Sequence, residues 1–400
     1  MSAIRVAASS APVVEDDAQP TWRSVLAGPL VAAMTLAGAI VAADTIGVEL
    51  RDPDGVAGRR LVGVVIFVLV LVAMDVFVRA ARRAQRRLPP RTVLAEVRAE
   101  RWSWPRGLAV GSALVSFYIS YLAYRNLKSA VPLLRPDYLL DRQLADLDRV
   151  LFLGRDPADL AHAIFGTGVA AEVLSVIYLL YVLFVPISLA VTLVFSANLP
   201  GGMFYATAAA INWPIGALSY IALPALGPVY YVPEDFRDLP VTGVSELQAL
   251  MLDQRMEFLA DPSVTGTAQS IAAFASLHVS VILTAVLAAY LLGFGRRTRL
   301  GLWVLLWSSV LATVYLGWHY VIDDVAGVAI ALLSLWLASK LTGFRIDPRA
   351  FRSRRRRGRF PAMHPAHDRP FEQRGVGRLC SSKTPRRSRR AQRGRSSRRA

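Results

Sequence analysis

The feature that most constrains this chain is a series of apolar runs, each close to the length of a membrane-crossing helix. A helix needs about 20 residues to cross the hydrocarbon core of a bilayer. Eight such runs lie at about 25–44, 61–78, 107–124, 169–195, 203–223, 274–294, 300–318 and 324–341. Because 54% of the 400 residues are hydrophobic, the composition also exceeds that of an ordinary soluble domain. The sequence therefore predicts an all-α integral membrane protein.

Charged residues differ between the loops that would lie on opposite sides of the membrane. The loop between the second and third runs is rich in arginine, whereas the segment 224–273 is mainly acidic. Basic loops stay in the cytoplasm, and an even number of crossings puts both ends of the chain on one side. We therefore expect a multi-pass protein of the cell membrane, with both termini cytoplasmic and the segment 224–273 on the exterior face.

The same pattern divides the chain into four parts. These are a cytoplasmic N-terminal segment (1–24), two transmembrane helices with a basic cytoplasmic loop (25–106), a six-helix membrane domain (107–341) and an Arg-rich disordered cytoplasmic tail (342–400). The formal net charge of +17 would suit nucleic acid, but the arginines collect beside the runs and in the tail, as membrane topology requires. We expect no specific nucleic-acid partner.

Two histidines, His278 and His319, lie at the ends of neighbouring apolar runs. They are 41 residues apart, about twice the length of one crossing, so the chain returns to the same face between them. Asp323 follows His319 by four residues and lies beside it on a helix, whereas Asp324 is turned away by about 100°. The carboxylate of Asp323 can hold one ring nitrogen of His319 and leave the other free to attack. The spacing predicts a membrane enzyme whose site opens to the exterior.

Two segments around these histidines resemble signatures of a known superfamily. Ser276-Leu277-His278 resembles the second signature, and the run 317–327, with its His-x3-Asp-x3-Gly spacing, resembles the third signature of the type 2 phosphatidic acid phosphatase superfamily. The resemblance covers about 107–341 and implies a six-helix catalytic core with two extra N-terminal transmembrane helices. Gly-Trp-His-Tyr and the upstream segments 147–149 and 154–157 are more similar to the inositolphosphotransferase branch, which includes inositol phosphorylceramide synthases.

The resemblance implies a role for each residue of the two signatures. His319 would attack phosphorus and form a phosphohistidine, and Asp323 would hold its ring in the required tautomer. His278 would protonate the departing oxygen and later activate the water or alcohol that releases the phosphoryl group. Ser276 would donate a hydrogen bond to a phosphate oxygen. The mechanism implies no metal and no cofactor, and the partner is a phospholipid or another lipid phosphate in the membrane.

The cations that would bind the phosphate depart from the family pattern. The third signature normally has an arginine six residues before its histidine, and this chain has Thr313 there. The first signature, Lys-x6-Arg-Pro, is spelled by Lys128 and Arg135, but it follows the first core helix and does not directly precede the second signature. Arg237 and Arg255 lie in the loop before the second signature and compete for the same role. The sequence leaves Lys128, Arg135 and Arg255 as candidates for phosphate binding.

Several functions remain open at this point. If water releases the phosphoryl group from His319, the protein is a lipid phosphatase. If a lipid or sugar hydroxyl releases it, the protein is a transferase. The resemblance favours transfer of a phosphoinositol-type head group. A transporter or proton relay would also use membrane histidines and acids, but the two halves show no clear inverted repeat and the histidines lie near one surface. A zinc hydrolase would take His278, His319 and Asp323 as ligands.

Overall fold

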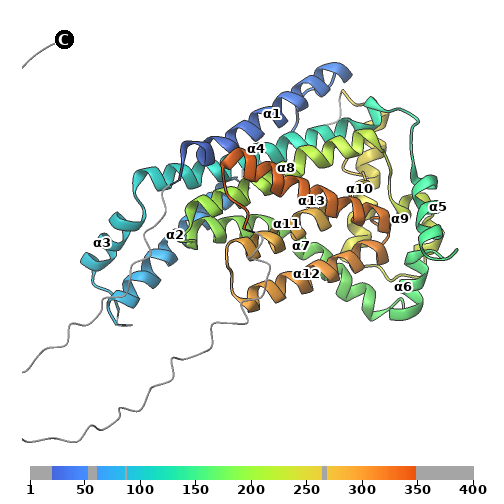
Figure 1. Cartoon of the computed structure of the whole chain (residues 1–400). Helices are drawn as coiled ribbons and strands as arrows, with labels where there is room; N and C mark the ends of the chain where they lie inside the picture. The colour runs from blue at the N-terminus through green and yellow to red at the C-terminus, as the bar shows by residue number, and fades with distance from the viewer. Residues whose placement is uncertain (1–19, 53–60, 86–87, 264–267, 348–400) are drawn as a thin grey trace, which may run out of the picture. The chain divides into compact units, whose positions relative to one another are not determined.

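The described residues of the computed structural model are 20–52, 61–85, 88–263 and 268–347, and they contain helices and no strands (Figure 1). The long helices are α1 (Trp22–Ile46), α2 (Leu61–Arg83), α4 (Trp104–Leu134), α7 (Val169–Phe195), α8 (Leu199–Ala222), α11 (Leu277–Leu291), α12 (Arg296–Tyr315) and α13 (Val321–Thr342). The shorter ones are α3 (Arg91–Arg101), α5 (Asp141–Leu151), α6 (Pro157–Phe165), α9 (Pro228–Tyr231), the 3-10 helix η2 (Pro233–Phe236) and α10 (Gly243–Ala260). Most of the predicted N-terminal segment and Arg-rich tail lies outside the described residues.

Each of the eight apolar runs forms a long helix, and this confirms the predicted all-α membrane fold. Among the described residues, six helices are long and apolar enough to cross a membrane: α1, α2, α4, α7, α12 and α13. Helix α11 has only 15 residues. Helix α8 is almost surrounded by protein, with Phe204, Ala208 and Asn212 fully buried, so it needs less hydropathy than a helix that faces lipid. The predicted count of eight crossings is therefore not established.

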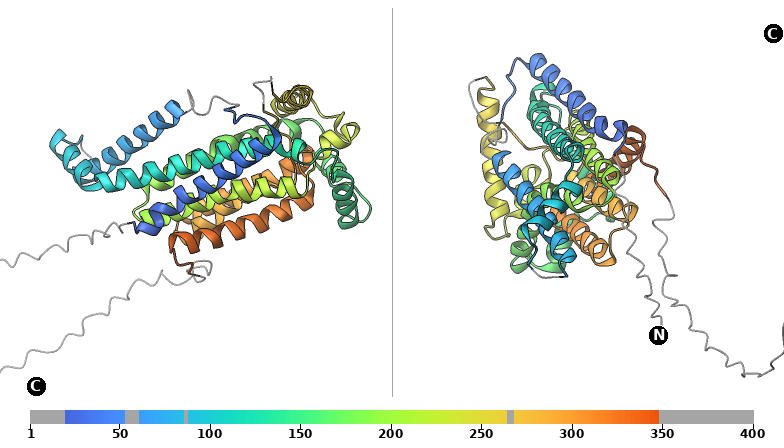
Figure 2. Two further views of the ribbon diagram at one scale, coloured as in Figure 1. Left: turned by 90° about the horizontal axis from the view of Figure 1, so that it is seen from above. Right: turned by 90° about the vertical axis from the view of Figure 1, so that its left-hand side faces the viewer.

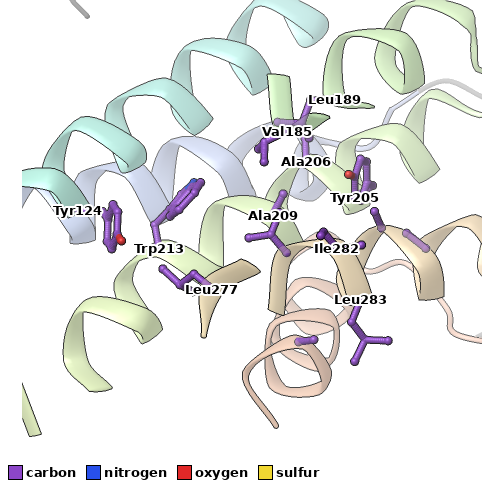
Figure 3. Packing of buried hydrophobic residues seen from close by; sticks show 14 of the residues in the cluster. Tyr124, Val185, Leu189, Tyr205, Ala206, Ala209, Trp213, Leu277, Ile282 and Leu283 are labelled. Carbon is purple, nitrogen blue, oxygen red and sulfur yellow. The ribbon is translucent and has the colours of Figure 1, made fainter. Parts of the chain in front are cut away.

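Helix α8 lies at the centre of the bundle and packs against α1, α4, α11 and α13. Figure 3 shows Trp213 and Ala209 of α8 between Tyr124 of α4 and the side chains of Leu277 and Ile282 of α11. The Trp213 and Tyr124 rings are 4.9 Å apart between centroids. Small residues of α8 let the neighbouring helices approach closely, which is the usual packing mode within a membrane.

The two N-terminal helices outside the predicted six-helix domain differ in their packing. Helix α1 lies along α4 and also contacts α8 and α13, so it is part of the central bundle. Helix α2 packs against α3 and α7 at the edge, and its large side chains remain mostly exposed. Of the two extra helices, only α2 is therefore peripheral.

The helix ends form two groups at opposite ends of the long helices (Figures 1 and 2). At the end that holds the arginine-rich α3, Arg23 of α1 donates to the carbonyl of Lys340 at the end of α13, at 2.9 Å. Arg101 of α3 donates to the carbonyl of Ser196 after α7, at 2.7 Å. The short helices α5, α6, α9 and α10 lie at the other end, where α11 and α13 begin. His278 and His319 are at this second end, opposite the basic loop, as the spacing predicted.

Candidate active site

The two signature histidines meet at the start of α11 and in the turn that joins α12 to α13. Nδ1 of His278 and Nε2 of His319 are 3.3 Å apart. His319 is buried, and His278 is partly exposed. Because the chain between them runs through α11 and α12, the two rings approach from elements that cross the bundle in opposite directions. The predicted convergence of the two imidazoles is present in the structure.

Asp323 occupies the position beside His319 that its spacing predicts. Its Oδ2 is 3.4 Å from Nδ1 of His319 and also accepts the backbone N–H of Tyr320 at 3.0 Å. The carboxylate is fully buried at the N-terminus of α13, where a negative charge is favoured by the helix dipole. Since Nδ1 faces Asp323, Nε2 is the ring nitrogen of His319 that faces His278.

The start of α11 lies directly against the start of α13. The backbone N–H of Ser276 donates to the carbonyl of Asp323 at 3.0 Å. A Cβ at Gly327 would overlap the carbonyl oxygen of Ser276 and approach Cβ of Val279 to 3.2 Å. Only glycine therefore permits this approach, and that explains the glycine of the His-x3-Asp-x3-Gly pattern physically.

Aromatic rings from α7 form a wall behind the histidines. The rings of Tyr178 and Tyr181 lie 4.7 and 4.3 Å from the His278 ring, and Tyr181 donates to the carbonyl of Leu277 at 3.1 Å. Trp318 stacks on Tyr178 with ring planes 2° apart and centroids at 5.1 Å. Sequence reasoning missed both tyrosines. Their i, i+3 spacing on an apolar helix was the available signal.

Two buried carboxylates of α5 hold the turn that carries His319. Asp148 accepts the backbone N–H groups of Val321 and Ile322 at 2.7 and 3.1 Å. These are the first amides of α13, which have no partner within their own helix. Burial raises the pKa of Asp148, and the two backbone hydrogen bonds oppose that rise. The carboxylate thus acts as a cap supplied by another helix.

Asp141, seven residues earlier on α5, ties the same turn to the loop after α8. It accepts the hydroxyl of Tyr320 at 3.0 Å and the backbone N–H groups of Leu226 and Gly227 at 2.9 Å. Burial raises its pKa, and these hydrogen bonds oppose the rise. Sequence reasoning noted the segment 147–149 as a family similarity but did not foresee either carboxylate as a support of His319.

The position of Asp324 on the helix suggested that it faces away from the site, but the structure buries it beside the site. It is 5% exposed, and its Oδ2 accepts the hydroxyl of Thr313 at 3.4 Å. The physical reason is that α11 packs against α13 and Thr313 of α12 reaches the same face. Thr313, which stands in place of the family arginine, also accepts the N–H groups of Trp318 and His319 through its carbonyl, at 2.9 and 3.2 Å.

Ser276 is fully buried and caps α11, because its Oγ accepts the N–H of Val279 at 3.5 Å. The structure gives Ser276 a role in joining α11 to α13, and its predicted bond to a phosphate oxygen stays a prediction.

The three candidate cations do not form one cluster. The Lys128 ammonium lies 5.0 Å above the Tyr220 ring and near both histidines. Arg135 and Arg255 instead line a cavity of about 280 Å³ beside the site. Arg237 is exposed on η2's C-terminal side. Lys128 is therefore the candidate that lies nearer to the reacting rings than to the cavity.

Burial lowers the pKa of His319, which lies between two spanning helices, to about 4. Asp324 opposes the shift, and Lys128 adds to it. His319 is consequently a neutral imidazole near pH 7, with a lone pair available for attack. The third described histidine, His162, lies on α6 and contacts the carbonyl of Tyr315 at 2.8 Å, so it caps α12 and takes no part in the pair.

A comparison with protein families identifies the segment that holds this geometry. Residues 142–337 match the family model described as the PAP2 superfamily. The matched segment, just under half of the chain, is similar to the PAP2 superfamily and is called the PAP2 domain below. No curated protein and no solved structure matched the chain. The PAP2 domain starts in α5 and ends in α13, so it includes Asp148, both histidines and Asp323.

The extent of the PAP2 domain bears on the predicted first signature. The resemblance was expected to begin near residue 107, but the match begins at residue 142. Lys128 and Arg135 lie before it, and Arg255 lies within it. Any role for Lys128 in the PAP2 site therefore rests on its position near the histidines and not on the family match.

Proposed function

We propose that this protein is a membrane-embedded phosphoesterase or phosphotransferase that acts on a lipid phosphate through a phosphohistidine at His319. The PAP2 domain agrees with a phosphatase-type enzyme. The observation that carries the proposal is the ordered chain of Asp323, His319 and His278, with contacts of 3.4 and 3.3 Å. It aligns an orienting acid, a neutral nucleophile and a second imidazole.

The first step would form a nitrogen–phosphorus bond and break a phosphorus–oxygen bond. The lone pair on Nε2 of His319 attacks phosphorus, and the electron pair of the breaking bond stays on the departing oxygen. His278 gives that oxygen a proton, so the product leaves as an alcohol. The phosphoryl group would enter between the two rings and replace their 3.3 Å contact. Lys128 would offset the charge on the phosphoryl oxygens.

The second step would reverse the roles. His278, now neutral, accepts a proton from an incoming hydroxyl, whose oxygen attacks phosphorus while the bond to His319 breaks. Water gives a lipid phosphatase, and an alcohol gives a transferase. We favour transfer of a phosphoinositol-type head group to a lipid or sugar alcohol, because the cavity beside the histidines offers room for a head group to remain bound between the steps.

The site is proposed to open to the exterior of the cell membrane, with both termini in the cytoplasm. Support comes from the separation of the arginine-rich α3 from the histidines, at opposite ends of the long helices. Basic segments remain on the cytoplasmic side. Labelling of single cysteines placed at Asp146 on α5 and at Arg98 on α3, with a reagent that does not cross membranes, tests the orientation: only the former should react in intact cells.

Purified protein incubated with phospholipids that carry a radioactive phosphate tests the chemistry. We expect a covalent adduct that is labile to acid and stable to alkali, and that is absent from His319→Ala. His278→Ala should slow formation or breakdown of the adduct. His162→Gln, which changes a histidine outside the pair, provides the control. Adding alcohols then separates transfer from hydrolysis by the product formed. An adduct that persists in His319→Ala would exclude this nucleophile.

A further inference from the structure

We propose that the cavity lined by Arg135 and Arg255 is a second anion subsite, which binds a negatively charged group of the lipid beyond the phosphorus that is attacked. This inference rests on the proposed function, because it concerns the substrate of the same site. The ligand class is a lipid diphosphate, or a phosphodiester lipid whose head group carries a further phosphate. The shared chemistry is a second anion next to the reacting phosphorus.

The cavity adjoins the histidine pair through one short segment. Its walls come from the end of α4, the loop after α8, helix α10 and the residues Ile271 and Ala272. The next residue, Ala273, lies near the His319 ring, and its N–H donates to the carbonyl of Ala225, another residue of the cavity wall, at 2.9 Å. The wall of the cavity therefore continues into the segment that lies near His319.

Arg255 is held at the wall of this cavity by a fully buried residue. Its Nη1 donates to Oε1 of Gln269 at 3.3 Å. Gln269 is itself fixed, because Nε2 donates to the carbonyl of Lys128 at 2.7 Å and Oε1 accepts the N–H of Ile271 at 2.9 Å. A guanidinium group carries five N–H donors in a planar fork that matches phosphate oxygens, so a positioned Arg255 can bind an anion with the donors that Gln269 does not use.

Arg135 approaches the same cavity from the end of α4. Its guanidinium carbon lies 4.4 Å from the centroid of the Tyr138 ring, and this stacking limits the side chain's freedom. Asp137 is the acidic residue of the cavity lining, so the two arginines leave an excess positive charge. Burial lowers the pKa of Arg255, which reflects the cost of a partly buried cation. An anionic ligand would offset that cost.

The division of the cations into two sets argues for two anions. Lys128 lies over the Tyr220 ring near the histidines, whereas Arg255 lies at the cavity wall beside Gln269 and near Asp141. The Asp141 carboxylate is already occupied by Tyr320 and by the loop amides. If the substrate had one phosphate, Lys128 would bind it, and no anion of the substrate would bind Arg135 and Arg255.

Equilibrium binding to the full-length chain tests this inference without turnover. His319→Ala protein in detergent is titrated with two matched pairs of short-chain lipids: an isoprenyl phosphate and diphosphate, and a phosphatidylinositol with and without a ring phosphate. We expect the member with the second anion to bind about tenfold more tightly in at least one pair, and that pair identifies the source of the anion. Equal binding within both pairs overturns the proposal.

Charge variants on this background locate the subsite. Arg255→Gln should reduce the preference to within about threefold, and Arg255→Lys should retain part of it. Arg142→Gln, an exposed arginine of α5 with 81% of its side chain accessible, is the matched control and should keep the full preference. Arg135→Gln changes a side chain that stacks on Tyr138 and has no hydrogen bond among the described contacts, and it repeats the test should Arg255→Gln fail to fold. If these variants weaken the binding of both lipids of a pair equally, the subsite is refuted. Failure of the proposed function would appear separately, as wild-type protein without His319-dependent turnover.

Discussion

Replacing Asp148 should impair catalysis although this residue lies outside the histidine pair. Its carboxylate accepts two N–H groups, from Val321 and Ile322, at 2.7 and 3.1 Å. A hydrogen bond to a charged group contributes about 1.5–3 kcal/mol, and loss of a helix cap costs about 0.5–2 kcal/mol. In Asp148→Ala, water can reach the helix end and replace part of the two lost hydrogen bonds. We therefore expect the free energy that orders the turn to fall by about 2–4 kcal/mol, less than the sum of the two bonds.

The expected consequence is a lower rate of chemistry with substrate binding largely unchanged. The turn positions Nε2 of His319, and misplacement of a reacting group by about 1 Å can cost about 100-fold in rate. We therefore expect kcat for Asp148→Ala to fall by about 10- to 100-fold, with KM within about threefold of the wild-type value. Asp148→Asn retains one acceptor oxygen and should give an intermediate rate.

The assay is the rate of phosphohistidine formation at saturating lipid, followed together with thermal unfolding. Asp146→Ala is the matched control, because Asp146 lies two residues before Asp148 on α5 but faces solvent. Its side chain is 59% exposed and, among the described residues, pairs only with Arg142 and Arg149. Asp148→Ala protein that unfolds like the wild type and labels as fast as Asp146→Ala would refute the reasoning. A raised KM with unchanged kcat would refute it as well.

Three further predictions concern the same site. Gly327→Ala should lower the unfolding temperature and the labelling rate together, because the added methyl group meets the Ser276 carbonyl; normal stability and labelling would contradict the packing argument. The pKa of His319 falls from about 6.5 in the unfolded chain to about 4 in the folded one, so its contribution to stability is present above pH 6.5 and is lost as pH falls toward 4. Thermal unfolding should therefore show that the advantage of wild type over His319→Asn shrinks across this window, by at most about 3 kcal/mol, and a constant difference would exclude the shift. Chelator treatment should leave the turnover rate unchanged, whereas a chelator-sensitive rate that zinc restores would favour a zinc hydrolase.

The pairing of His278, His319 and Asp323 could be predicted from sequence because local geometry relates these residues. The rise of a helix and the thickness of a bilayer return the chain to one face after about 40 residues, and i, i+4 spacing places Asp323 beside His319. Both rules operate along one or two neighbouring helices. No such rule places Asp148, because it meets Val321 across 173 positions of the chain.

Other features were missed or left open for the same reason. The apolar pattern of α8 resembles that of a crossing helix, but its burial on nearly all sides depends on α1, α4, α11 and α13. Asp324 is buried by α11 and by Thr313 of α12, and helical periodicity alone does not reveal these neighbours. Sequence likewise could not separate Lys128 from Arg135 and Arg255, since their distances to the histidines depend on how α4 and α10 pack.

The amino-acid sequence by itself determined the helices, their membrane character and the meeting of two imidazoles with one carboxylate, because hydropathy and helical spacing are local properties of the chain. Only the tertiary structure decided what surrounds them: the α5 carboxylates that hold the turn, the tyrosine wall of α7 and the division of the cations between the histidines and the cavity. Contacts between distant segments depend on the packing of whole helices, and packing sums many weak interactions that no short stretch of sequence contains.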